Sequence, residues 1–171
     1  LEDWLAEITE ALAAHDKANP DSPAAPFAIN QIVHKSNDRL EHDMQVCAKY
    51  KVPIVITSLG ARTDLTEAVH GWGGIVLHDV TTLRHAEKAL EAGVDGLVLV
   101  AAGAGGHAGT LSPFALVDEV RRIFDGPLAL SGAITQGRQV LAAQAMGADL
   151  AYIGTRVIAT TESMANERYK A

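Results

Sequence analysis

Six short apolar runs alternate with stretches of helical periodicity along most of the chain, and this alternation constrains the fold more than any other feature. The runs are almost continuously apolar, which is typical of parallel strands that are buried on both faces. Their starts lie roughly 20 to 30 residues apart, about the length of one strand-plus-helix unit. The six runs start at Phe27, Val52, Gly73, Asp95, Gly126 and Ala148.

The alternation predicts an α/β fold with a parallel sheet, but it does not decide the topology. An amphipathic helix is expected over residues 1–16, before the first run. A flavodoxin-like or Rossmann sheet could be built from six such units, whereas a closed (β/α)8 barrel needs eight strands. The length of 171 residues and the 48% hydrophobic content predict a single domain over residues 1–171.

Composition excludes several classes of function. The formal charge of −7 argues against a general nucleic-acid or anionic-membrane surface, although it leaves room for a local phosphate site. The single cysteine, Cys47, cannot form an internal disulfide, and no signal-peptide pattern or long apolar run is seen. We therefore expect a cytoplasmic protein. Paired cysteines and His motifs at ligand spacing are not found, so no metal is expected.

Small and polar residues gather where the predicted strands end. In parallel α/β folds these carboxyl ends form the binding site. The stretches "ALSGAITQG" and "YIGTRV" place Gly132 and Gly154 at the ends of the last two strands, where the main chain could approach an anion closely. This pattern favours a phosphate site. The alternative is that the two glycines only allow tight turns.

The loop "GAGGHAG" after the fourth run contains His107 between glycines. A loop with so few side chains could let a flat ring system lie on its backbone, with His107 beside it. A neutral imidazole suits a general base near pH 7. The alternative is a flexible connection with an exposed histidine.

The segments "FAINQIVHKSN", "VPIVITSLG", "AGGHAG", "SGAI" and "GADLAYIGTRVIAT" closely resemble, in this order and spacing, the nitronate monooxygenase family, also called 2-nitropropane dioxygenases. The resemblance runs from about Phe27 to Ser163. It implies an FMN-dependent oxidoreductase, a flavoprotein on a TIM barrel. Such an enzyme oxidises nitronates or nitroalkanes with O2 to carbonyl compounds and nitrite.

The resemblance also implies roles for individual residues. His107 would be the catalytic base, and Gly105 and Gly106 would lie against the flavin. Gln31 matches a family position that contacts FMN, whereas Asp79 stands where some members have a lysine near the flavin, so it is expected to line the pocket. The phosphate end of FMN would be held by Ser131, Gly132, Gly154 and Thr155.

The six runs would correspond to strands three to eight of the barrel, with the first two strands missing, so the chain is expected to be a fragment. The expected partners are a small nitro compound and O2, with no nucleic acid and no membrane; a homo-oligomer is left open. Two other functions are left open. One is reduction of an enoyl-ACP or a quinone by a related flavin enzyme using NAD(P)H, and the other is a non-catalytic fragment or phosphate-binding module.

Overall fold

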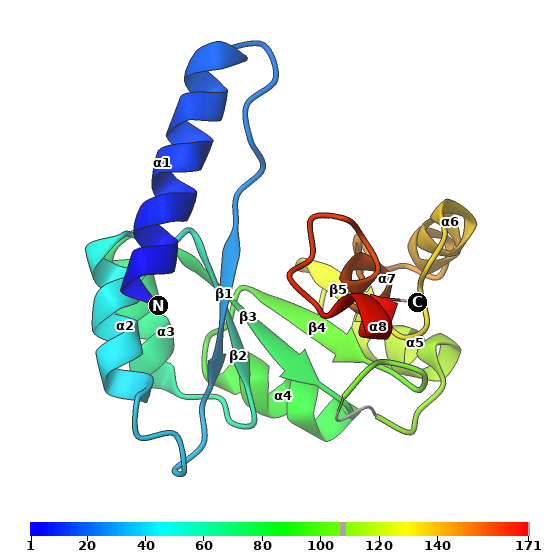
Figure 1. Ribbon diagram of the computed structural model, residues 1–171. Coiled ribbons are helices and arrows are strands. Elements are labelled where there is room, and N and C mark those ends of the chain that lie inside the picture. Colours follow the sequence, from blue (N-terminus) through cyan, green and yellow to red (C-terminus); the bar gives the residue numbers. More distant parts are fainter. Residues whose placement is uncertain (107–108, 171) are drawn as a thin grey trace. The chain divides into compact units, whose positions relative to one another are not determined.

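The computed structural model describes residues 1–106 and 109–170, in which helices and strands alternate (Figure 1). All six predicted strands are present. In chain order the elements are α1 (Glu2–Ala18), β1 (Ala28–Ile32), α2 (Leu40–Lys49), β2 (Ile54–Ser58), α3 (Thr63–Gly71), β3 (Ile75–Val80), α4 (Leu83–Glu91), β4 (Gly96–Val100), α5 (Pro113–Arg121), β5 (Leu128–Ser131), α6 (Gly137–Ala145), β6 (Leu150–Tyr152), α7 (Thr155–Ile158) and α8 (Glu167–Lys170).

The strands follow one another in the sheet in the order of the chain, β1-β2-β3-β4-β5-β6. Parallel pairing places Ala28 opposite Ile54, and Ala129 of β5 lies opposite Leu150 of β6. Doubly wound sheets of the Rossmann and flavodoxin types reverse their strand order at a switch point. The sequential order therefore separates this chain from both, and it is the order found in a (β/α)8 barrel.

The chain divides into two compact units, Leu1–Leu77 and His78–Ala171, with the boundary inside β3. The first unit is built around fully buried side chains that include Val52, Val55 and Val69. Helix α1 contributes Leu5 to this core, whereas its neighbour Trp4 is 70% exposed. The prediction of a single domain over residues 1–171 stays a prediction.

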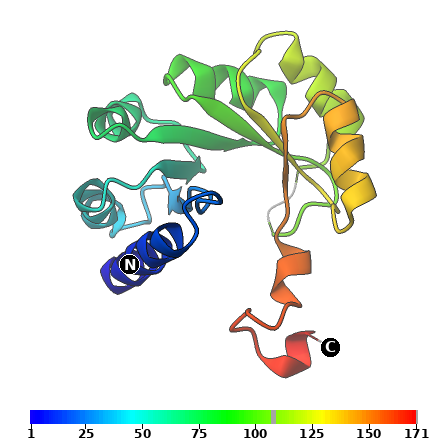
Figure 2. The same cartoon turned by 90° about the horizontal axis from the view of Figure 1, so that it is seen from above.

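The second unit has its core between β4 and the helices that follow. Leu97 and Leu99 of β4 and Val98 between them are almost completely buried, as expected for a strand covered on both faces. Leu116 of α5 is also fully buried. In Figure 2, helices α4, α5 and α6 lie on the outer side of β4, β5 and β6, and the segment after β6 leaves toward the opposite side.

Arg121 fixes the segments that lead into β5 and β6. Its guanidinium donates from Nε to the carbonyl of Gly147 at 2.7 Å and from Nη1 to the carbonyl of Gly126 at 2.7 Å. Nη2 donates to Asp149 Oδ2 at 2.6 Å, and the same oxygen accepts the backbone N–H of Leu128 at 2.8 Å. Both strands therefore begin from one charged cluster, which fixes their relative register.

Within residues 1–106 and 109–170, no helix combines the length and the apolar character needed to cross a membrane.

Candidate functional site

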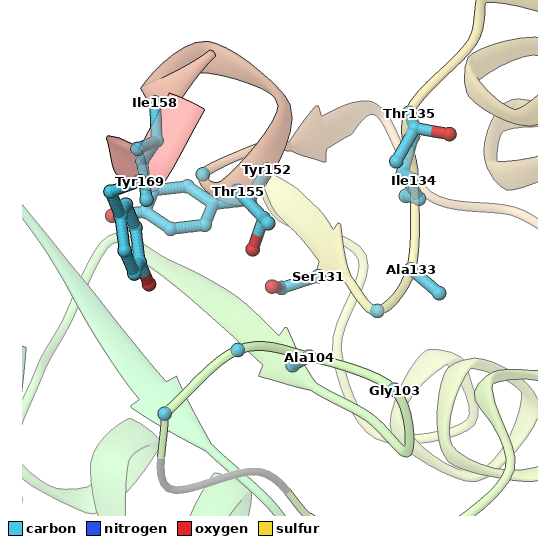
Figure 3. Close-up of a pocket in the computed structure, with 14 residues that line it drawn as sticks. Gly103, Ala104, Ser131, Ala133, Ile134, Thr135, Tyr152, Thr155, Ile158 and Tyr169 are labelled. Carbon is cyan, nitrogen blue, oxygen red and sulfur yellow. The ribbon is translucent and has the colours of Figure 1, made fainter. Parts of the chain in front are cut away.

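The loops at the carboxyl ends of β4, β5 and β6 surround a cavity of about 460 Å³ in the second unit (Figure 3). Three chain segments form it: the glycine-rich loop after β4, the loop from β5 to α6, and the segment after β6. Its lining residues are Gly103, Ala104, Gly105, Gly106, Ser131, Gly132, Ala133, Ile134, Thr135, Tyr152, Gly154, Thr155, Ile158 and Tyr169.

Two of the loops that form the cavity are tied to each other through the main chain. Ala133 donates its backbone N–H to the carbonyl of Gly103 at 2.9 Å. A Cβ atom placed on Gly105 would lie 3.3 Å from Thr155 Oγ1, so the glycine-rich loop also passes close to the segment after β6. One backbone hydrogen bond therefore joins two walls of the cavity, and the third wall comes close to the glycine-rich loop through the Thr155 side chain.

Some backbone donors of the β5–α6 loop are already used inside the chain. The side-chain oxygen Oε1 of Gln139 accepts the N–H groups of Thr135 and Gln136 at 2.8 and 3.0 Å, as well as the Thr135 hydroxyl at 3.1 Å. Gln139 thus satisfies the amides at the start of α6. These groups are not available to a ligand.

Four other backbone donors are available at the cavity. Within the described part of the chain, no acceptor is found for the N–H groups of Gly132, Ile134, Gly154 and Thr155. Backbone N–H groups without a partner inside the protein must be satisfied by water or by a ligand. A group of such donors around one cavity is suited to the oxygen atoms of an anion.

Gly154 keeps part of the cavity open. Its backbone has φ −112°, which an L-amino acid adopts without strain, and a Cβ atom built on it would meet no atom within 4 Å. Neither backbone strain nor crowding by the chain itself requires glycine at this position. A side chain here would instead extend into the open space of the cavity that Gly154 lines.

Hydroxyl groups complete the polar lining. The hydroxyls of Ser131 and Thr155 point toward the same space, with the rings of Tyr152 and Tyr169 beside it (Figure 3). Burial raises the pKa of the Tyr152 phenol, and the negative charge of Asp79 adds to this effect. The phenol therefore stays protonated at neutral pH. The described lining residues include no lysine or arginine, so an anion here would be held by neutral donors.

The structure brings together six of the residues that the sequence singled out. Gly105, Gly106, Ser131, Gly132, Gly154 and Thr155 all line the cavity. Their predicted contacts with FMN stay predictions. Asp79 does not line the cavity; it is half-buried on β3 of the same unit, where its charge acts on Tyr152.

The predicted roles of Gln31 and His107 are not tested by this cavity. Gln31 belongs to the first unit, is 3% exposed, and donates from Nε2 to Cys47 Sγ of α2 at 3.7 Å. Its side chain therefore faces helix α2, and its predicted contact with the flavin stays a prediction. His107, the predicted base, lies outside the described residues.

The sequence missed the two tyrosines of the cavity. Tyr152 could have been found, because strand side chains alternate and Tyr152 precedes Gly154 by two residues. Tyr169 carried no comparable signal, since it lies on the short helix α8, well after the last predicted strand. Among the described residues, no group of His, Cys, Asp and Glu has an arrangement that could hold a metal ion.

Comparison with known proteins identifies the family. Its model, nitronate monooxygenase, matches residues 8–171. The nitronate monooxygenase of Paraburkholderia phytofirmans is 34% identical over 104 residues, which are 56% of this chain and 28% of that protein. A curated (3aS,4S,5R,7aS)-5-hydroxy-7a-methyl-1-oxo-octahydro-1H-indene-4-carboxyl-CoA dehydrogenase of Rhodococcus jostii is 26% identical over 145 residues, covering 85% of this chain and 40% of that protein.

The solved structure of FabK from Thermotoga maritima matches with a TM-score of 0.79 and 30% identity, over 90% of this chain and 49% of that one. The chain spans between 28% and 46% of the length of the curated relatives that it matches. The parallel strands in sequential order agree with this likeness, and the prediction of about six βα units of a TIM-barrel fold is confirmed. With a family model that matches nearly its whole length, this chain belongs to the nitronate monooxygenase family.

Proposed function

We propose that the cavity holds the phosphate end of FMN, and that the protein is an FMN-dependent nitronate monooxygenase. The observation that carries the proposal is the set of backbone N–H groups of Gly132, Ile134, Gly154 and Thr155 around one cavity, without an acceptor in the described chain. A phosphate monoester offers three acceptor oxygens to such donors. The open space at Gly154 gives it room to approach the main chain.

The hydroxyls of Ser131 and Thr155 would add two hydrogen bonds to this phosphate. Gly105 and Gly106, which lack side chains, would leave a surface on which a flat ring can rest. When bound, FMN supplies the redox chemistry that carries electrons from the substrate to O2. The chain's own contribution is to bind and orient the cofactor and to move one proton.

His107 is proposed as the base that removes the α-proton of a nitroalkane. Its place in the glycine-rich loop is known from the sequence alone. A nitronate has already lost this proton, so it would not need the base. His107→Asn should therefore lower kcat/KM for a neutral nitroalkane strongly and for the pre-formed nitronate much less. Equal losses on both substrates would contradict the role of His107 in proton removal.

A second candidate is a reductase that takes electrons from NAD(P)H to an enoyl thioester or a quinone. The similarity to a curated carboxyl-CoA dehydrogenase favours it, since that name describes a reaction without a nitro group. Anaerobic mixing with NADPH separates the two candidates. Rapid bleaching of the bound flavin would support the reductase, whereas bleaching by a nitronate but not by NADPH would support the monooxygenase.

The remaining proposals follow from the same activity. A small nitro compound and O2 are the proposed partners, and the cytoplasm is the proposed location. The third alternative, a non-catalytic fragment or phosphate module, predicts that His107→Asn changes no rate.

Titration with FMN and with riboflavin tests the proposed cavity. Purified chain is titrated under anaerobic conditions, and binding is followed by flavin fluorescence and visible absorbance. The two ligands share their ring system and differ in the phosphate. We expect saturable binding of FMN and binding of riboflavin weaker by at least tenfold, about 1.4 kcal/mol. Equal affinity for the two ligands would contradict a phosphate site.

A further inference from the structure

The glycine-rich loop after β4 is closed at its base by two backbone hydrogen bonds. Ala102 donates its N–H to the carbonyl of Leu111 at 2.8 Å, and Gly109 donates to the carbonyl of Val100 at 3.2 Å. Between these two points, the described residues Gly103 to Gly106 line the cavity. The position of that wall therefore depends on how firmly the base of the loop is held.

Gly109 is the point of closest approach at this base. A Cβ atom on Gly109 would lie 2.3 Å from the carbonyl oxygen of Val100, a distance that no real Cβ adopts. It would also lie 3.2 Å from Cβ and 3.5 Å from Cγ2 of Thr81. The loop backbone at Gly109 thus lies between the end of β4 and the side chain of Thr81.

The orientation of Thr81 is set by the next helix. Thr81 Oγ1 and His85 Nδ1 are 2.9 Å apart, within hydrogen-bond distance. His85 itself is held at the start of α4, where its backbone N–H donates to Thr82 Oγ1 at 3.2 Å. A β-branched side chain has few rotamers, and a hydrogen bond to its hydroxyl selects one of them. The selected rotamer directs the Thr81 methyl group toward Gly109.

We propose that Thr81 and His85 act together as positioning residues for the glycine-rich loop, with the His85 imidazole fixing the Thr81 rotamer and the Thr81 methyl group packing against Gly109. Neither residue lines the cavity. They would act through the backbone of Gly103 to Gly106. This positioning role rests on the proposed function, in which the same loop contacts the flavin and carries His107.

Hydrogen–deuterium exchange of peptides covering residues 101–112 tests the proposal without any ligand. Thr81→Ala and Thr81→Ser both remove the methyl group and should speed exchange of the loop amides by about fivefold. Thr81→Val has nearly the shape of threonine and keeps a methyl group toward Gly109 when its second methyl group takes the place of the hydroxyl, so exchange should stay within about twofold of the unmodified chain. Peptides from β4 and α5 should exchange at unchanged rates in all three variants.

A double-substitution cycle tests the part assigned to His85. His85→Ala should speed loop exchange in the unmodified chain but have no effect in the Thr81→Val background, where no hydroxyl is left for His85 to bond. Arg84→Ala, at the exposed neighbour on the same helix, is the control and should change nothing. An equal effect of His85→Ala in both backgrounds, or normal loop exchange in Thr81→Ala, would overturn the proposal.

The consequence for the cavity is measured separately by FMN titration. Thr81→Ala should weaken FMN binding about three- to tenfold, and Thr81→Val should restore it. Unchanged FMN affinity in Thr81→Ala, in a chain that binds FMN, would overturn the link between the loop and the cavity. Failure of the unmodified chain to bind FMN would count against the proposed function alone, because loop exchange is measured without the ligand.

Discussion

The two ends of β5 and β6 use their polar groups in opposite ways. At the amino ends, Arg121 and Asp149 satisfy each other and several backbone groups at distances of 2.6 to 2.8 Å. At the carboxyl ends, the N–H groups of Gly132 and Gly154 have no acceptor in the described chain. Paired groups stabilise a fold, whereas donors left available at a cavity are suited to a ligand. The comparison separates a structural end from a binding end within the same two strands.

The largest effect is expected at the amino ends. Arg121→Ala removes the hydrogen bonds to Gly126, Gly147 and Asp149, and should lower the free energy of unfolding by about 2 to 3 kcal/mol. Most of this loss comes from the two carbonyls, because the Asp149 side chain is 55% exposed and its ion pair adds little. Urea unfolding monitored by circular dichroism measures this loss of unfolding free energy. The cavity should keep its affinity for FMN at temperatures where the variant is folded.

Arg122→Ala is the matched control for this prediction. Arg122 pairs with Asp118 one helical turn away, and both side chains are largely exposed. Exposed pairs of this kind contribute about 0.5 kcal/mol or less. If Arg121→Ala costs no more than Arg122→Ala, the amino-end cluster is not the structural element that its hydrogen bonds indicate.

A second prediction concerns His78 of β3. This histidine lies near the carboxyl end of its strand, but its side chain is buried in the core. It is 5% exposed, and burial, followed by the positive charge of His85, lowers its pKa to about 4 from an ordinary 6.5. The unfolded chain binds the proton more readily, so stability is complete above pH 6.5 and falls as the pH drops toward 4. The loss should reach about 2 to 3 kcal/mol.

Unfolding by urea at several pH values measures this loss. His78→Gln should flatten the pH dependence between 6.5 and 4, while His42→Gln, at an exposed position of α2, should leave it as in the unmodified chain. A pH profile unaffected by His78→Gln would show that this histidine does not control acid stability.

Much of the difference between the structural ends and the binding ends of the strands could be predicted from the sequence. The apolar runs predicted every strand, because burial on both faces demands continuous apolar residues, and Leu97 to Leu99 show this clearly. The small residues at the strand ends predicted the cavity wall, because the carboxyl ends of parallel strands meet at one edge. The alternation alone did not predict the order of the strands, since it fits several topologies; the resemblance to a TIM-barrel family did.

The direction of individual side chains was harder to predict. Neighbouring residues on a strand face opposite sides, so a difference of one position decides whether a side chain meets a ligand or a helix. The direction of the Gln31 side chain is known only from the structure, which buries its amide against Cys47; its predicted contact with FMN stays a prediction. The Arg121–Asp149 cluster joins residues far apart in the sequence, and no local pattern announces such a pairing.

At the carboxyl ends, Gly154→Ala is expected to have the largest effect on binding. The new Cβ meets no atom of the chain and causes no backbone strain, so stability should hardly change. It would occupy space needed by a phosphate, and FMN affinity should fall at least tenfold, about 1.4 kcal/mol. Gly137→Ala is the control, because its Cβ also meets nothing but lies on α6, outside the cavity lining.

The smallest effect compares two hydroxyls of the same cavity wall. Ser131 points its hydroxyl into the cavity (Figure 3), whereas the Thr135 hydroxyl is bound to Gln139 Oε1 at 3.1 Å. Ser131→Ala should weaken FMN binding about three- to tenfold, or roughly 0.7 to 1.4 kcal/mol, within the net contribution of one typical hydrogen bond. Thr135→Val should leave FMN affinity unchanged and cost only stability. A larger loss of affinity in Thr135→Val than in Ser131→Ala would mean that pairing inside the chain does not separate structural from ligand-binding groups at this end of the sheet.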